Sequence, residues 1–593
     1  MSHVSYSIRR GTPSPFNYLS NRQLPLIQKN TLYTLFARDE AKLPMALLGV
    51  LVGIIAGLIT NLFRFILEET LPYFGNGLHH DNFEALPSAW HFLLPVTGCI
   101  VIGQILYFLA DKNSPMGVSY VIDKVQRFRT RMPIRNAVLQ FVTASLALLS
   151  GGSCGREGPA IHIGATSGCA LGRGFSLPNN SIRTLIAAGS AAAISAAFNT
   201  PIAGVIFAME VILMEYAVSG LIPVIVAAVS GAVITQALYP GEPVFVITNV
   251  SMESLWQIPW VIVMGLIIGA LASGFVKLYG YATSFKQVDI RLRLLIVGLV
   301  TGSVALFMPE VLGTGYDTVN TALQENMALS FLLALLIMKG VLSAAGVGLG
   351  LPGGLIGPSL VLGGIAGAAL GIIGEEIISG TDSSTPFYVL IGMCAMMGAT
   401  LQAPLAALMA LLELSNNPGI VLPAMLIIVV ANITSSEIFK TRSIFMNSII
   451  AKAGGFSPDL SRYLSRYGIG AVASRAFELL KADSEEALIR ELLDADPEWV
   501  VIDHNGEKKS LVSQHSLKEA LKTPGFDLGS LEAAHQVIAV SHQATLLEAM
   551  EILAENNATY GYVHLHSENR NEITGLFSQD DIMAFYKGSD SKK

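Results

Sequence analysis

Two opposite charges stand side by side inside a long apolar stretch of this chain, in the pentapeptide Gly155-Arg156-Glu157-Gly158-Pro159. An ionisable side chain in a membrane-type segment is costly unless it lines a path for water or ions, so this pentapeptide marks a candidate functional site. Glycine lets the backbone approach a ligand, and proline fits the first turn of a helix. Because a helix amino terminus carries partial positive charge, the pattern predicts a site for a small anion.

The same glycine–proline spacing recurs about 200 residues later, in the segment 354–358. A second pair of related segments, 199–210 and 402–413, follows in the same order, and each ends in a glutamate. Two homologous halves of inverted topology, about 43–240 and 256–440, explain both pairs. The alternative is chance similarity between glycine-rich segments.

The composition indicates an integral membrane protein with a soluble part. Of the 593 residues, 52% are hydrophobic and 14% are charged, whereas soluble proteins carry about 25% charged residues. Residues 43–63 and 87–110 are apolar and long enough to cross a bilayer. Gly49, Gly53 and Gly57 fall on one helix face, which favours close packing inside the protein over a dimer seam.

Later segments are broken rather than simple spans. Residues 184–209 and 340–374 are rich in small residues and contain prolines. Non-helical backbone is tolerated at membrane depth only where protein buries it or a watery cavity borders it. The predicted fold is therefore an all-α, multi-span membrane domain with an inverted repeat and broken, re-entrant helices, followed by an α/β domain.

The two ends of the chain are polar. Residues 1–42 carry more Lys and Arg than Asp and Glu, which places the amino terminus in the cytoplasm, and no signal peptide is recognisable. Residues 43–455 form the predicted membrane domain and 456–482 a linker. Residues 483–593 alternate between strand and helix patterns, and we expect this domain also to be cytoplasmic.

Other chemistries find no support in the sequence. The four cysteines lie far apart in apolar segments and are interpreted as small hydrophobic residues, so no metal site is predicted. No phosphate-binding loop of an ATP-driven pump occurs. No acid pair or nucleophile–base set indicates catalysis, so the chain is not predicted to be an enzyme or to need a cofactor. No nucleic-acid partner is expected.

These motifs, with Ser443-Ile444-Phe445 near the end of the membrane domain, resemble the CLC family of chloride channels and proton/chloride exchangers over residues 43–455. The resemblance implies about eighteen helices, a homodimer with one pore per subunit, and chloride transport across the cell (inner or plasma) membrane. Glu157 matches the gating glutamate, whose carboxylate competes with the anion. The implied anion-binding residues are Met116, Gly117, Val118, Ser119, Gly155, Arg156, Gly158, Pro159, Gly354, Leu355, Ile356, Gly357, Pro358 and Phe445.

The departures from the family pattern concern hydroxyl groups. Met116 stands where the family has a coordinating serine, although a shifted fit could let Ser119 serve. Phe445 replaces the central tyrosine, and Ile356 replaces a phenylalanine of the second motif. If both hydroxyls are lost, the central ion keeps backbone donors only, and we expect a weaker site.

Val211 follows Glu210 at the position where well-known exchangers of the family carry a second, inner glutamate. Valine cannot carry a proton, so the sequence favours a passive, voltage- or pH-gated channel. The alternative is proton/chloride antiport, with the proton relayed by water, Glu215 or another group. A fluoride exporter and a membrane-anchored nucleotide sensor are less favoured.

The C-terminal domain resembles the CBS domain pairs that many CLC proteins carry. In the second repeat, Ser578 and Asp581 fit a pattern that contacts adenine nucleotides. The first repeat lacks the corresponding aspartate. Nucleotide binding therefore stands beside two alternatives, a purely dimer-stabilising domain and a simple helix cap formed by Ser578 and Asp581.

Overall fold

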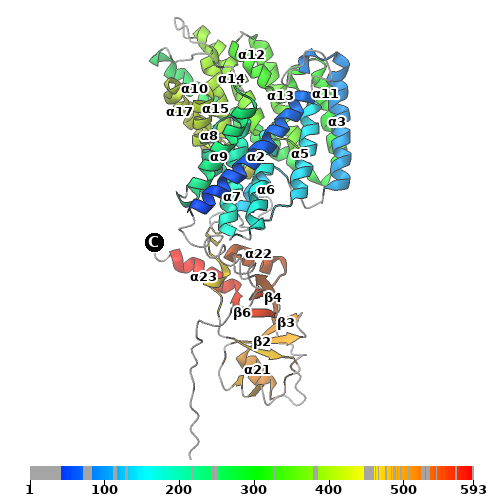
Figure 1. Cartoon of the computed structure of the whole chain (residues 1–593), viewed down its shortest axis with the longest axis vertical. Coiled ribbons are helices and arrows are strands. Elements are labelled where there is room, and N and C mark those ends of the chain that lie inside the picture. Colours follow the sequence, from blue (N-terminus) through cyan, green and yellow to red (C-terminus); the bar gives the residue numbers. More distant parts are fainter. Residues whose placement is uncertain are drawn as a thin grey trace, which may run out of the picture.

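The computed structural model covers both predicted domains (Figure 1). It describes residues 42–70, 83–110, 116–126, 131–175, 177, 179–216, 218–241, 245, 247, 252, 254–324, 327–377, 385–446, 460, 463–464, 467–474, 477–482, 484, 489–490, 492–493, 497, 499–504, 508–522, 528, 535–541, 544–567 and 570–590. The predicted cytoplasmic segment 1–42, apart from its last residue, and much of the predicted linker lie outside this range.

The membrane domain is helical and divides into two series of eight helices within the described residues. The first series is α2 (Lys42–Thr70), α3 (Ser88–Leu109), α4 (Val118–Gln126), α5 (Ile134–Leu149), α6 (Glu157–Gly174), α7 (Asn179–Phe198), α8 (Pro201–Phe207) and α9 (Val218–Leu238). The second is α10 (Ile258–Thr283), α11 (Ile290–Ala305), α12 (Tyr316–Gln324), α13 (Leu329–Leu349), α14 (Ile356–Ile377), α15 (Thr385–Leu401), α16 (Pro404–Ser415) and α17 (Val421–Ile433).

Corresponding helices of the two series pack in corresponding ways. Helix α2 packs on α9 as α10 packs on α17, and α6 packs on α7 as α14 packs on α15. The backbone repeats as well: Asn199 and Gln402, just before α8 and α16, have φ of 57° and 54°. Such left-handed values are uncommon outside glycine, so their recurrence at matching places supports the repeat. The predicted fold class is confirmed.

Helix α2 shows why small residues recur in the sequence. A Cβ atom on Gly49 would lie 2.6 Å from the carbonyl oxygen of Pro223 in α9, and one on Gly53 would lie 2.4 Å from that of Ala227. Backbone meets backbone at this crossing, so the glycine face of α2 is used inside the protein, as the sequence analysis favoured.

The closest crossings in each half hold the helices that follow the glycine–proline motifs. A Cβ atom on Gly189 of α7 would lie 2.0 Å from the Gly164 carbonyl oxygen of α6. In the second half, a Cβ atom on Gly392 of α15 would lie 2.5 Å from the Gly363 carbonyl oxygen of α14. These two contacts hold α6 and α14 in place against their neighbours. They thereby determine where in the fold the amino terminus of each helix lies.

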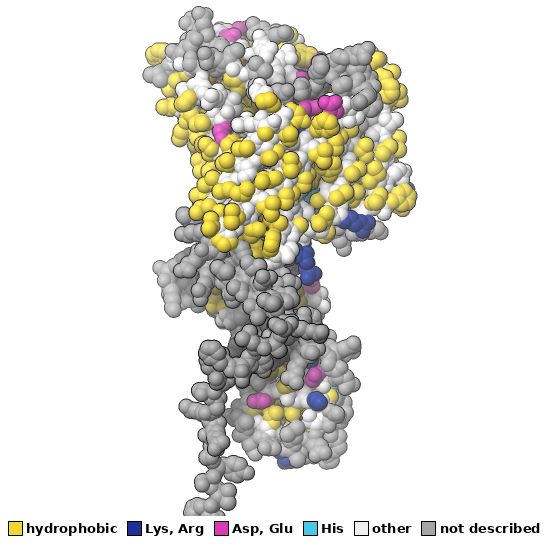
Figure 2. All heavy atoms as spheres, in the orientation of Figure 1, with side chains coloured by type: hydrophobic (Ala, Val, Ile, Leu, Met, Phe, Trp, Pro, Cys, Tyr) yellow, Lys and Arg dark blue, Asp and Glu magenta, His cyan; other side chains and the backbone are white. Residues whose placement is uncertain are grey.

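The outer surface of this domain suits a lipid bilayer. Within the described residues, eight helices are long and apolar enough to cross a membrane, and four shorter apolar helices accompany them. Figure 2 shows apolar side chains covering the visible face, with Lys and Arg side chains at the margin toward the C-terminal domain. Helices such as α8 and α16 are too short to span ~30 Å alone, as expected for re-entrant segments.

The C-terminal domain contains a six-stranded sheet in the order β1 (Phe477–Lys481), β2 (Trp499–His504), β3 (Lys508–Ser513), β4 (His535–Ser541), β5 (Tyr560–Ser567) and β6 (Arg570–Ser578). In each group of three strands, the first pair is parallel and the second pair is antiparallel. The helices α21 (Gln514–Ala520) and α23 (Gln579–Asp590) follow β3 and β6. Two copies of one unit therefore lie side by side.

The alternation of strands and helices predicted for residues 483–593 is present after residue 499, where α22 (Leu546–Glu555) lies between β4 and β5, but the domain starts earlier than predicted. Strand β1 lies inside the predicted linker 456–482 and pairs with β2. Leu464 and Ile469 also lie in that range, and both are buried in the core of the second unit. Their isolated apolar side chains gave no periodic pattern, so the sequence suggested a linker where the chain enters the domain.

Candidate functional site

The two glycine–proline motifs meet in the interior of the membrane domain. The Gly155 amide donates to the Gly354 carbonyl oxygen at 2.8 Å, and the Gly354 amide donates to the Gly155 carbonyl oxygen at 2.7 Å. Directly after this bridge, α6 begins at Glu157 and α14 begins at Ile356. The chain is thus folded so that two helix amino termini from opposite halves stand next to each other.

Glu157 lies between these two termini and is fully buried. Its Oε2 accepts a hydrogen bond of 3.1 Å from the Gly357 amide in the first turn of α14. The same oxygen is 2.4 Å from where a Cβ atom on Gly155 would be and 2.9 Å from where one on Gly357 would be. The carboxylate therefore occupies space that exists only because both positions are glycine.

Tyr316 supplies the second hydrogen bond to Glu157, through its hydroxyl to Oε1. This tyrosine is the first residue of α12. Its ring packs at 5.3 Å, centroid to centroid, from Phe245, and at 6.3 Å from Phe198. The Arg156 guanidinium lies 5.7 Å from the centre of the same ring. A donor set that holds a buried carboxylate can also hold another small anion, because both present one negative charge to the same donors.

Tyr316 was not among the site residues predicted from the sequence. The available signal was the segment Gly313-Thr314-Gly315-Tyr316, a glycine-rich start to a helix that corresponds, in the second half, to the segment before α4. This segment contains no charged residue. It therefore lacks the signal that marks the pentapeptide at 155–159 as a candidate site.

The other predicted anion ligands are distributed as follows. Gly158 and Pro159 are buried in the first turn of α6, and Leu355, Ile356 and Pro358 are buried around the start of α14. Arg156 donates from Nη2 to the Ala197 carbonyl oxygen at 3.5 Å.

The segment before α4 and the residue near the end of the domain lie apart from this cluster in the contacts of the described residues. Gly117 has a φ of 88° and is followed by Val118 and Ser119 in α4. Met116 packs against an apolar cluster that contains Cys99 and Leu148. Phe445 lies in a helical turn, 444–446, and is buried in the main core. Among the described residues, no hydrogen bond or ring contact joins Met116, Ser119 or Phe445 to Glu157.

The position that the family resemblance relates to an inner proton acceptor lies in a π-helix, Ala208–Leu213, that continues α8. Val211 is buried there. The adjacent Glu210 is engaged in a structural contact: its carboxylate accepts hydrogen bonds from the amides of Leu405 and Ala406 at 3.3 and 2.8 Å, in the first turn of α16. Single π-turns often mark functional positions, and this one has no counterpart in the continuous α16.

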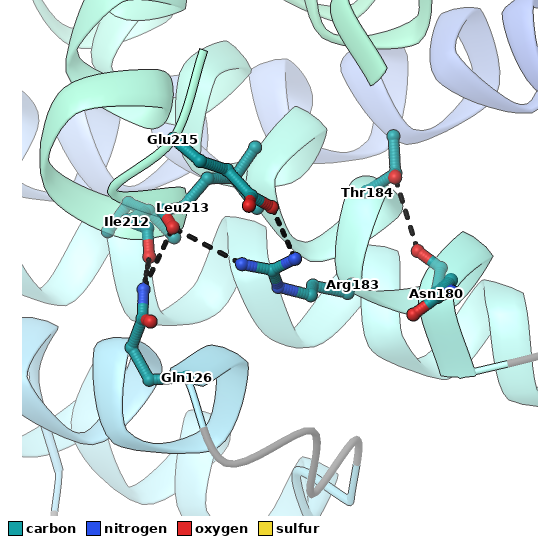
Figure 3. Close-up of polar contacts among 7 residues, drawn as sticks. All are labelled: Gln126, Asn180, Arg183, Thr184, Ile212, Leu213 and Glu215. Atoms are coloured by element: carbon teal, nitrogen blue, oxygen red, sulfur yellow. Dashed lines mark hydrogen bonds and ion pairs between the residues drawn. The ribbon is translucent and has the colours of Figure 1, made fainter. Parts of the chain in front are cut away.

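Glu215, the alternative proton relay, follows the end of the π-helix (Figure 3). It forms an ion pair with Arg183 of α7, and 37% of its side chain is exposed. Arg183 also donates to the Leu213 carbonyl oxygen at 3.2 Å, and Gln126 donates to the carbonyls of Ile212 and Leu213 at 3.1 and 2.9 Å. The free carbonyls at this helix end are thus satisfied by side chains.

Glu413 repeats the contact of Glu210 from the opposite direction. Its two oxygens accept hydrogen bonds from the amides of Ile202 and Ala203 at 2.8 and 2.7 Å, in the first turn of α8. Each half therefore caps the broken helix of the other half, and the glutamates predicted to end a repeated segment are structural.

Replacing Glu413 with alanine should destabilise the membrane domain, because two amides at the start of α8 lose a charged acceptor. Hydrogen bonds to charged groups contribute about 1.5–3 kcal/mol each. Because these two bonds are partly exposed, we expect each contribution to lie near the lower end of that range. The expected result is a lower unfolding temperature of the detergent-solubilised protein. Glu437→Ala, which removes an exposed ion pair with Lys440, is the control and should leave that temperature unchanged.

In the C-terminal domain, Ser578 and Asp581 bond to each other. Asp581 Oδ2 accepts from the Ser578 amide at 2.8 Å and from the Ser578 hydroxyl at 2.7 Å, and the Asp581 amide donates to the Ser578 hydroxyl at 3.1 Å. This is a reciprocal cap at the start of α23, the structural alternative that the sequence allowed.

Comparison with known proteins agrees with this arrangement. Residues 98–436, more than half of the chain, match the family model described as voltage gated chloride channel. A putative chloride channel protein ClcB-like from Ralstonia nicotianae is 27% identical over 66% of this chain and 93% of its own length. An H(+)/Cl(-) exchange transporter ClcA from Vibrio parahaemolyticus is 25% identical over 67% of this chain and 87% of its own.

Among solved structures, a slow cyanobacterial Cl-/H+ antiporter has a similar fold, with a TM-score of 0.62 and 20% identity over 69% of this chain and 98% of that chain. At this identity, the likeness concerns the fold alone. Together with the paired motifs and the buried Glu157, the matched range shows that this chain belongs to the voltage gated chloride channel family, the CLC family.

Proposed function

We propose that this protein transports chloride across a membrane through a gated pathway in each subunit, with Glu157 as the gate. The observation that carries the proposal is the position of the Glu157 carboxylate, held by the Gly357 amide between the starts of α6 and α14. Partial positive charge at two helix starts attracts an anion without holding it as tightly as a full charge would. When the carboxylate is protonated or displaced, a chloride ion takes its place.

The pathway is passive in this proposal, and voltage or pH gates it. The inner position holds Val211, and the neighbouring carboxylate of Glu210 caps α16. The second candidate, proton/chloride antiport, is supported by the partly exposed Glu215 beside Arg183, which could exchange protons with the cytoplasm. Both kinds of transporter occur among the named relatives.

We also propose a domain assignment and a membrane environment, with the family membership as support. In this proposal residues 43–455 are the transport domain, and the anion ligands are backbone amides around Gly155 and Leu355, with Val118, Ser119 and Phe445 at the central ion. Lys and Arg side chains at the margin toward the C-terminal domain (Figure 2) support a cytoplasmic location for that domain. We also propose a homodimer. Apolar residues on the short helices, among them Ile202 and Leu405, each 48% exposed, suit a subunit interface.

The C-terminal domain is proposed to be a CBS pair that stabilises the dimer or regulates the pathway. Its two similar units of three strands support that identity. Because Ser578 and Asp581 are accounted for by their mutual cap, an adenine nucleotide is not needed to explain either residue.

The test is a flux measurement on the purified protein in liposomes, with a chloride electrode outside and a pH-sensitive dye inside. We expect chloride release above that of empty liposomes and no uphill movement of protons when a chloride gradient is applied. Proton uptake against its gradient would show antiport instead. Absence of halide flux at every pH tested would contradict the proposed function.

A further inference from the structure

We propose that Tyr316 is a ligand of the transported anion: its hydroxyl holds the Glu157 carboxylate when the pathway is closed and binds the anion when that carboxylate leaves. The inference rests on the proposed anion pathway. It assigns to a residue of α12 the kind of hydroxyl contact that the sequence lacks at Met116 and Phe445.

The repeat explains how a tyrosine reaches this place. Gly315 precedes Tyr316 with a φ of 81°, as Gly117 precedes Val118 with a φ of 88°. In both helices the carbonyl of that glycine accepts the first helical bond, at 3.3 Å, from Val319 in α12 and from Val121 in α4. Helix α12 is thus the second-half counterpart of α4, and its first residue carries a hydroxyl where α4 carries valine.

The two groups that donate hydrogen bonds to Glu157, the Tyr316 hydroxyl and the Gly357 amide, lie beside each other. This arrangement suits a single small ligand. The Tyr316 hydroxyl oxygen is 2.8 Å, and Glu157 Oε2 is 2.9 Å, from where a Cβ atom on Gly357 would be. Packing of the tyrosine ring on Phe198 and Phe245 fixes the direction of the hydroxyl. Donors that are held in place by packing need no reorganisation when one acceptor replaces another.

Two cations lie near Tyr316 or the glycine that precedes it, and their positive charge favours an anion in this part of the protein. The Arg156 guanidinium lies over the ring. The ammonium of Lys339 in α13, which is fully buried, is 2.7 Å from where a Cβ atom on Gly315 would be and donates to the carbonyls of Glu310, Val311 and Leu312. One cation lies over the ring and the other beside the preceding glycine, so a substitution that removes only the hydroxyl oxygen leaves both of these contacts in place.

The bond to Glu157 could instead be purely structural, and a Glu157→Ala background separates the two roles. In that background the carboxylate is gone, so a tyrosine that served only Glu157 would have no further effect. We expect Glu157→Ala/Tyr316→Phe to bind chloride about tenfold or more weakly than Glu157→Ala in isothermal titration, because a hydrogen bond to a charged ligand is lost. Chloride flux at low chloride concentration should fall in parallel.

The matched control is Tyr388→Phe, which removes the hydroxyl of another buried tyrosine, in α15, and should leave chloride affinity unchanged. Equal affinity of Glu157→Ala with and without Tyr316 would overturn the inference, whereas absence of halide flux in the unmodified protein would overturn the proposed function instead. Should Tyr316→Phe fold poorly, ring-fluorinated tyrosine at position 316 provides a second test. It keeps the shape and strengthens the donor, so tighter chloride binding is expected and unchanged binding would contradict the proposal.

Discussion

Replacing Glu157 with alanine should give chloride flux that no longer depends on pH. In the unmodified protein the carboxylate is held by the Gly357 amide and the Tyr316 hydroxyl, where it occupies the space proposed for the anion. In the proposed gating, a proton on this carboxylate removes the charge that competes with the anion, so flux should rise as pH falls. Alanine cannot occupy the space between α6 and α14, and flux should therefore be high at neutral pH as well as in acid.

The measurement is initial chloride efflux from liposomes between pH 4.5 and 7.5, normalised to the amount of protein inserted. Glu437→Ala removes a glutamate that is exposed and paired with Lys440, and it should keep the pH response of the unmodified protein. If Glu157→Ala retains that response too, the pH dependence resides in another group and the assigned gate is wrong.

Replacing Gly189 with alanine should prevent stable folding of the membrane domain. The new Cβ atom would lie 2.0 Å from the Gly164 carbonyl oxygen, and neither backbone can move without separating α7 from α6. Extra atoms in a well-packed core commonly cost about 1–3 kcal/mol, and a clash with backbone belongs at or above the top of that range. Because α6 begins at Glu157, the same shift would also displace the gate.

The measurement is the yield and the unfolding temperature of the solubilised protein, followed by size-exclusion chromatography after heating. Gly274→Ala is the control, since a Cβ atom on this glycine of α10 meets nothing within 4 Å and alanine favours a helix over glycine. A normal elution profile and unfolding temperature for Gly189→Ala would show that this crossing tolerates more than its geometry indicates.

Much of this architecture could be predicted from the sequence, because the features that define it are local. Glycine and proline at short spacings mark the breaks before α6 and α14, and the buried charge of Glu157 stands out against its apolar neighbours. The spacing of the glycines in α2 likewise predicts a close helix crossing, and these glycines pack against α9.

The contacts that complete the site could not be predicted, because they join residues far apart in the chain. Tyr316 and Glu157 are 159 positions apart, and their meeting depends on how the second half lies against the first. The role of Glu210 could not be predicted for the same reason. Its neighbour Val211 was interpreted in terms of proton transfer, whereas the Glu210 carboxylate accepts hydrogen bonds from amides nearly 200 residues away.

The exchange of caps between Glu210 and Glu413 has a consequence for biogenesis. A ribosome that has released only the helices up to α9 leaves the amides at the start of α8 without the carboxylate that later satisfies them, and it leaves Glu210 without its amides. The nascent amino-terminal portion therefore lacks these hydrogen bonds in the membrane until the remaining spans are inserted. Neither portion is therefore expected to persist when expressed alone, whereas the two portions produced together in one cell should assemble.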